Sequence, residues 1–293
     1  MPTNTPHRST LDRVSDALGL PPPRRGVRAQ LRACAAAITF LTRIPIGAVV
    51  AHDVNDLPGA ATYFPVVGLI VGVAGAIVFG LAARMWPPTI AVMLSIAFTV
   101  WITGALHEDA LADAFDGFGG GWDRAQVLSI MKDSRVGSYA LVGVLLVIAL
   151  KLAALRAIVD AAPVRRGLVT GGAIAVGRAM ISAHVLGRWS SVALIADHAY
   201  VRAAGANERE GAGRPFAGAV TRIRLAVTTA LALLITVLAL GRATLAVVVV
   251  TGVVVWLAGR YFERRIGGIT GDALGAANQL VELAVYLTLA ARW

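Results

Sequence analysis

Residues 107–137 read HEDALADAFDGFGGGWDRAQVLSIMKDSRVG and contain six of the seventeen carboxylates of the chain. Asp109, Asp113 and Asp116 are spaced i, i+4 and i+7. A helix turns by about 100° per residue, so these three side chains fall within about 60° of one another on one face. Carboxylates this close repel one another unless a cation lies among them. The spacing therefore predicts a site for a hard divalent cation, which binds carboxylate and phosphate oxygens.

The rest of this stretch supplies what a phosphorylated substrate needs. Glycines at 119–121 offer flexible backbone, and Lys132 and Arg135 follow them. A solvated acidic helix end beside a membrane is the alternative interpretation. The opposite face of the segment is apolar, however, which favours a half-buried helix carrying the carboxylates. His107, directly before the acidic run, is a candidate contact to metal or phosphate, and Asp123 with Gln126 fits a helix cap.

Composition indicates an integral membrane protein. Hydrophobic residues make up 57% of the chain and charged residues 15%, against roughly 45–50% and 25% in soluble proteins. Several nearly charge-free runs are long enough to cross a bilayer. Cations exceed anions by 27 to 17, but they form no patch, so we expect no nucleic-acid partner. Cys34 is the single cysteine, which excludes an internal disulfide.

The predicted fold class is all-α, a polytopic membrane bundle of about seven transmembrane helices. Residues 1–30 are expected to form a polar, basic cytoplasmic tail with a short helix at 10–19, and 31–293 a single integral membrane catalytic domain. Segment 31–49 carries Arg43 and Pro45, so a re-entrant or interfacial helix is favoured over a full span. The expected spans are 62–83, 87–106, 138–160, 167–187, 224–240, 242–258 and 273–291.

The distribution of cations predicts the orientation. If 31–49 does not cross, loops 107–137, 188–223 and 259–272 share the side of the N-terminus. That side then carries nineteen Lys and Arg residues and the other side five. The positive-inside rule places these loops in the cytoplasm, and the expected location is the cytoplasmic (inner) membrane.

Two further features are candidates for the same site. Residues 267–272 are glycine-rich and open a helix with Asp272, where Gly271 allows close approach of an anion to the backbone. Arg178 lies within an expected span, and an intramembrane charge is a functional candidate. We expect Arg178 to bind a phosphate or to pair with the aspartates. Lys151 and Arg156 are interpreted as residues that extend to a membrane surface.

With these motifs in view, the chain resembles the cobalamin synthase family, the adenosylcobinamide-GDP ribazoletransferases. The matching pieces, in family order, are FLTRIP at 40–45, YFPVVG at 63–68, HxDxLADxxDG at 107–117, MKDSRxG at 131–137 and TGDxLGA at 270–276. There are departures: Glu108 and Ala110 stand where the family usually has Leu and Gly, and Gln279 where many members carry a carboxylate. Residues 1–30 lie outside the resemblance.

The resemblance implies the final step of nucleotide-loop assembly in vitamin B12 synthesis. α-Ribazole, or its 5′-phosphate, is joined to adenosylcobinamide-GDP, and GMP is released with Mg²⁺ as cofactor. Asp109, Asp113 and Asp116 would bind one or two Mg²⁺, and Asp133 or Asp272 would complete the shell or act as base. Candidate phosphate or substrate contacts are Lys132, Ser134, Arg135, His107, Arg178 and Gly271. The small substrates and membrane lipid are the expected partners, and a homo-oligomer stays open.

Two other functions remain open at this level. A CDP-alcohol phosphotransferase of phospholipid synthesis also uses aspartates at a regular spacing, but the rest of the sequence signature of that family is missing here. A cation or metabolite transporter would also use intramembrane aspartates. Transporter sites usually lie at the bilayer midplane, whereas these carboxylates cluster in a long loop and at span ends.

Overall fold

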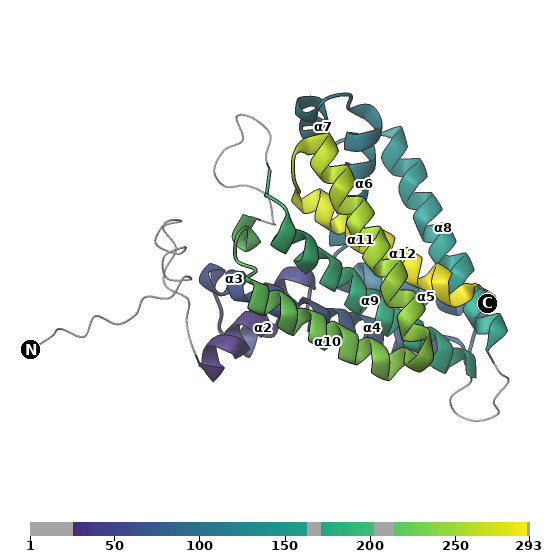
Figure 1. Cartoon of the computed structure of the whole chain (residues 1–293). Helices are drawn as coiled ribbons and strands as arrows, with labels where there is room; N and C mark the ends of the chain where they lie inside the picture. Colours follow the sequence, from purple (N-terminus) through teal and green to yellow (C-terminus); the bar gives the residue numbers. More distant parts are fainter. Residues whose placement is uncertain (1–25, 163–170, 202–213, 292–293) are drawn as a thin grey trace, which may run out of the picture.

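The computed structural model describes residues 26–162, 171–201 and 214–291. In these ranges the regular elements are helices (Figure 1), apart from one isolated β-bridge between Tyr200 and Ile269. The predicted all-α membrane bundle is confirmed. The expected helix at 10–19 and nearly all of the tail at 1–30 lie outside the described residues. The principal helices are α2 (Val27–Leu41), α4 (Phe64–Ala82), α5 (Pro88–Thr103), α6 (Leu106–Gly120), α7 (Arg124–Ile130), α8 (Ser138–Ala161), α9 (Gly171–Asp197), α10 (Arg222–Leu240), α11 (Thr244–Ile266) and α12 (Gly271–Ala290).

The number of spans is smaller than the seven predicted. Five helical stretches in the described ranges are long and apolar enough to cross a membrane, or six if α5 and α6 count as one span bent by 90°. The difference arises because α5 has only 16 residues and because α10 and α11 form one stretch of 45 residues. Each predicted span still coincides with a helix. With 15 residues, α2 is shorter than the roughly 20 that a bilayer requires.

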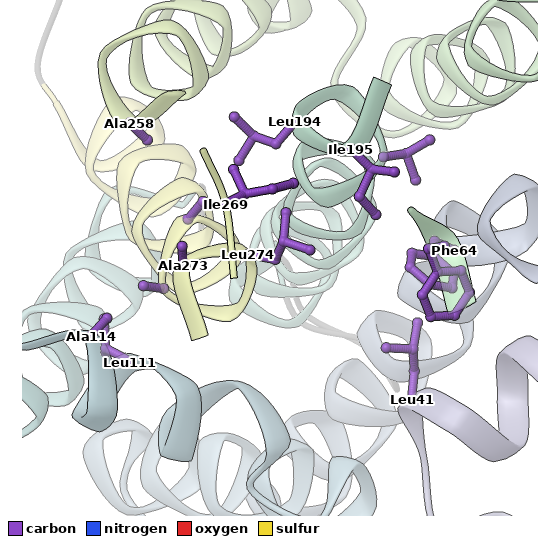
Figure 2. Close-up of a cluster of buried hydrophobic side chains, with 14 of the residues drawn as sticks. Leu41, Phe64, Leu111, Ala114, Leu194, Ile195, Ala258, Ile269, Ala273 and Leu274 are labelled. Atoms are coloured by element: carbon purple, nitrogen blue, oxygen red, sulfur yellow. The ribbon is translucent and has the colours of Figure 1, made fainter. Parts of the chain in front are cut away.

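Helices α9 and α12 form the interior of the bundle. Their most apolar windows are 78% and 72% buried, against 28% for α8 and 11% for the α10–α11 stretch. The peripheral helices α8, α10 and α11 therefore expose the apolar surface suited to lipid. Figure 2 shows part of the core, in which Leu111 of α6, Leu274 of α12 and Leu194 of α9 belong to one buried cluster.

Glycines allow α4 and α9 to pack backbone against backbone. A Cβ placed on Gly72 would lie 2.6 Å from the Cα of Ile181, and one on Gly68 would lie 2.8 Å from the Cα of Val185. Close approach of this kind is what small residues four apart permit in membrane helices. The Gly68–Gly72 pair is thus used inside the chain.

A bend between α5 and α6 sets the direction of the acidic helix α6. Gly104 (φ 68°) and Ala105 (φ 58°) both adopt the left-handed conformation, which is strained for alanine. The backbone amide of Arg43 donates to the carbonyl of Ile102 at 2.7 Å, so the FLTRIP segment after α2 supports the bend from outside. Helix α6 then continues through Gly119 and Gly120, so these two residues are helical where a flexible loop was expected.

Candidate active site

Three sequence motifs that lie far apart in the chain meet around α6. A Cβ on Gly275 of α12 would overlap Ala110 of α6, so these two helices touch at that point. The hydroxyl of Thr270, which caps α12 by accepting from the amide of Ala273 at 3.1 Å, lies 4.0 Å from the sulfur of Met131. The acidic helix, the MKDSR loop and the glycine-rich start of α12 therefore form one site.

The carboxylates gather on one side of α6. Asp109 is exposed, while Asp113 and Asp272 are partly buried. Asp113 interacts electrostatically with Asp272, Asp109 and Asp116, so α12 adds a fourth acidic group to the predicted three. Among the described residues, no three His, Cys, Asp or Glu side chains stand close enough to form a complete metal site. In phosphate-handling sites Mg²⁺ is bound by one or two carboxylates together with substrate oxygens and water.

Asp116 has a structural task that the spacing argument missed. Its two carboxylate oxygens accept from the backbone amides of Gly137 at 2.6 Å and Ala140 at 2.9 Å. Those amides belong to the start of α8, where no residue of α8 itself supplies a side-chain cap. A Cβ on Gly137 would lie 2.5 Å from Oδ1 of Asp116, so a side chain at this position would displace the Asp116 carboxylate. Asp116 therefore caps the N-terminus of α8 and joins the end of the MKDSR loop to α6.

We expect Asp116→Ala to lower the free energy of unfolding by about 1–3 kcal/mol, because a buried and a partly buried amide donor lose their acceptor. Asp116→Asn keeps one acceptor oxygen and should lose roughly half of that. Thermal unfolding in detergent measures both effects. The same two variants assayed across Mg²⁺ concentrations separate the cap from a ligand. If Asp116 serves only as a cap, both variants keep the half-saturating Mg²⁺ concentration of the wild type. A rise of tenfold or more in that concentration would instead mark Asp116 as a metal ligand.

The MKDSR loop presents its polar side chains to solvent. Lys132, Ser134 and Arg135 are exposed. The Arg135 guanidinium donates to both oxygens of Asp133, at 3.0 Å to Oδ1 and 2.5 Å to Oδ2. This pairing with Arg135 lowers the pKa of Asp133 to about 2. A carboxylate of so low a pKa is a poor proton acceptor near neutral pH, which disfavours Asp133 as the base.

The structure places two of the predicted substrate contacts, Arg178 and His107, away from the aspartates. Helix α9 extends to Asp197, ten residues beyond the predicted end of its span. Arg178 therefore lies about 28 Å along α9 from that end, exposed near the far side of the bundle, and does not reach the acidic face. His107 is buried on the inner face of α6 and faces the charges of Arg188 and Glu282.

A buried polar cluster was not predicted. Glu282 of α12 accepts from Nζ of Lys151 (α8) at 2.7 Å, from Nδ1 of His184 (α9) at 2.7 Å and from the guanidinium of Arg188 (α9). Lys151 also donates to Gln279, whose amide donates to Glu108 of α6 at 3.0 Å. The sequence contained an indication of this cluster, because charged residues within apolar spans usually pair with one another or have a function. The expectation that Lys151 extends to a membrane surface is wrong, because its side chain is buried.

A polytopic helical bundle with an acidic face, exposed cations and a capped, glycine-rich helix start at one end defines an integral membrane enzyme of phosphate chemistry. Comparison with known proteins gives the particular family. Residues 33–290 match the CobS family, described as cobalamin-5-phosphate synthase, and the chain belongs to this family.

Curated relatives agree over nearly the whole chain. A protein of Ralstonia nicotianae named adenosylcobinamide-GDP ribazoletransferase is 40% identical over 267 residues, 90% of this chain and 97% of its own length. Proteins of the same name from Shewanella amazonensis and Leptothrix cholodnii are 38% and 41% identical, covering 88% and 86% of this chain and 94% and 92% of their own lengths. No solved structure matches the chain.

Proposed function

We propose that this chain joins α-ribazole, or its 5′-phosphate, to adenosylcobinamide-GDP in a Mg²⁺-dependent reaction that releases GMP. The transferase activity is that of the family to which the chain belongs. The observation that carries the residue assignment is the meeting of the acidic helix, the MKDSR loop and the start of α12 at one site.

The reaction is a phosphoryl transfer in which one phosphorus–oxygen bond forms and one breaks. A free ribose hydroxyl oxygen of ribazole, one that is not esterified in the 5′-phosphate, forms a bond to the phosphorus that bears cobinamide, and the bond from that phosphorus to the bridging oxygen of the pyrophosphate breaks. GMP leaves with that oxygen, and the hydroxyl proton passes to a base. Positioning and neutralisation of charge dominate catalysis of this type.

Asp109 and Asp113 would hold the metal, with the diphosphate and water completing the shell. Bound Mg²⁺ would neutralise the developing phosphate charge and orient the oxygens. Asp116 is left out of this set, because its oxygens serve the α8 amides. Lys132 and Arg135 are exposed on the adjoining loop and would contact the remaining phosphate oxygens, while Ser134 and the Gly271 amide offer further donors.

Asp272 is the better candidate for the base, since the Asp133 carboxylate forms an ion pair with Arg135. A lowered pKa means that the Asp133 carboxylate stays ionised until the pH falls towards 2. Asp133 therefore cannot produce the acid limb of a pH–rate profile measured between about pH 5 and 9. We expect Asp133→Asn to keep the wild-type acid limb and Asp272→Asn to lose it along with most of the rate. Loss of the limb in Asp133→Asn alone would reverse the assignment.

Orientation and partners follow from the same account. We propose that the acidic loop, the loop after α9 and the loop before α12 share the side of the N-terminus and face the cytoplasm across the inner membrane. Membrane lipid would cover the exposed apolar faces of α8, α10 and α11. The structure contains one chain, and a homo-oligomer stays a prediction.

Parallel incubations test the function against its rivals. Purified protein receives adenosylcobinamide-GDP with α-ribazole in one tube and CDP-diacylglycerol with radiolabelled alcohols in the other. The proposal expects a nucleotide-looped corrinoid in the first and no labelled phospholipid in the second. Labelled phospholipid alone would put the CDP-alcohol transferase in its place. Uptake of unconverted corrinoid into proteoliposomes would favour a transporter.

A further inference from the structure

We propose that the buried cluster of Lys151, Glu282, Arg188, His184, Gln279 and Glu108 is a positioning device that fixes the rotation of α6, with Glu108 and Gln279 as its link to the active site. Three elements contribute the inner part of the cluster: α8, α9 and α12. Gln279 then connects this part to α6, one residue before Asp109. The inference rests on the transferase function proposed above.

Charge balance shows why Glu108 belongs to the cluster. Lys151 and Arg188 are two buried cations, and among the residues that the structure describes Glu282 is the one carboxylate in direct contact with both. With the histidines counted as neutral, this inner group carries a net positive charge. Burial of unbalanced charge is strongly unfavourable. Glu108 supplies the second carboxylate, and the Gln279 amide bridges it to Lys151 by accepting from the ammonium and donating to the carboxylate.

Three contacts then hold α6 along its length. Glu108 is tied to Gln279 near the start, Ala110 lies against Gly275 two residues further on, and Asp116 is tied to the α8 amides near the end. Of these, only the Glu108 link joins a charged residue beside the metal face to the buried cluster. A rotation of α6 by 20° would move a carboxylate about 2 Å, since side chains extend about 5–6 Å from the helix axis. Displacements near 1 Å can lower rates by about 100-fold.

A reciprocal exchange tests the link directly. Glu108→Gln leaves the cluster with excess positive charge, and Gln279→Glu places two carboxylates against each other. The double variant restores the charge balance, because Glu at 279 accepts directly from Lys151 and the amide at 108 donates to it. We expect each single variant to lower kcat about tenfold or more with KM changed less than threefold, and the double variant to recover to within about threefold of wild type.

The matched control is Asp160→Asn, the same carboxylate-to-amide change in the Arg156–Asp160 pair on α8, away from the cluster. It should keep wild-type turnover. Thermal unfolding of all four variants is measured alongside. The proposal is overturned if the double variant loses as much as the product of the two single losses, or if the single variants lower Tm while turnover per folded molecule stays unchanged. Product formation by the wild-type chain in the same series tests the transferase function separately.

Discussion

Asparagine in place of Asp113 is expected to lower turnover by about 10²–10³-fold while the chain remains folded. Asp113 is the carboxylate that interacts with all the others: Asp109 and Asp116 on its own helix and Asp272 on α12. Its amide replacement keeps the shape but removes the charge that would hold Mg²⁺ among them. Because four carboxylates close together repel one another, removing one charge should leave the stability unchanged or slightly raised.

Steady-state kinetics at several Mg²⁺ concentrations, with Tm in detergent, measure both parts of this result. We expect the half-saturating Mg²⁺ concentration to rise and Tm to hold. Asp160→Asn again serves as the control of equal chemistry. An Asp113→Asn protein that inserts and unfolds normally yet turns over at the wild-type rate would remove the metal assignment.

The second large effect is on stability. We expect Gly68→Ala to lower Tm strongly, because the new Cβ would lie within 3 Å of the backbone of α9, at 2.8 Å from the Cα of Val185. Backbone cannot move aside as a flexible side chain can, so the α4–α9 contact must open. Overpacking of this kind costs about 1–3 kcal/mol, and more if the two helices separate.

Gly80→Ala is the matched control, since it lies on the same helix and its Cβ would meet nothing within 4 Å. Alanine favours helix over glycine by about 1 kcal/mol, so this variant should be neutral or slightly stabilised. Thermal unfolding of the two proteins in the same detergent decides the point. Equal Tm values for the two variants would contradict the close packing of α4 on α9.

Much of the fold follows from local pattern. Apolar runs broken at Pro87-Pro88 and at Gly241 predict helix positions well, because length and hydropathy suffice to define a membrane helix. The cap formed by Asp123 is also confirmed, since its side chain accepts from the Gln126 amide at 2.9 Å. These features depend on residues that are close together in sequence.

What the sequence could not provide depends on contacts between distant segments. The spacing of Asp116 predicts a metal ligand, and only its contacts with the amides of Gly137 and Ala140 reveal its role as a cap of α8. Arg178 and Arg188 are both cations in or near one span, and the packing around α9 leaves Arg178 exposed and buries Arg188. Glu108 and Gln279 are separate departures from the family pattern, yet in the structure they touch at 3.0 Å.

We propose that this site performs a metal-dependent transfer of the cobinamide phosphate to ribazole. The most direct measurement follows GMP and corrinoid product together, with purified wild-type protein, adenosylcobinamide-GDP and α-ribazole, first with EDTA and then after Mg²⁺ is added in excess. We predict no product in EDTA, and one GMP for each nucleotide-looped corrinoid once Mg²⁺ is restored. GMP release without corrinoid product, or full product formation in EDTA, would contradict the account.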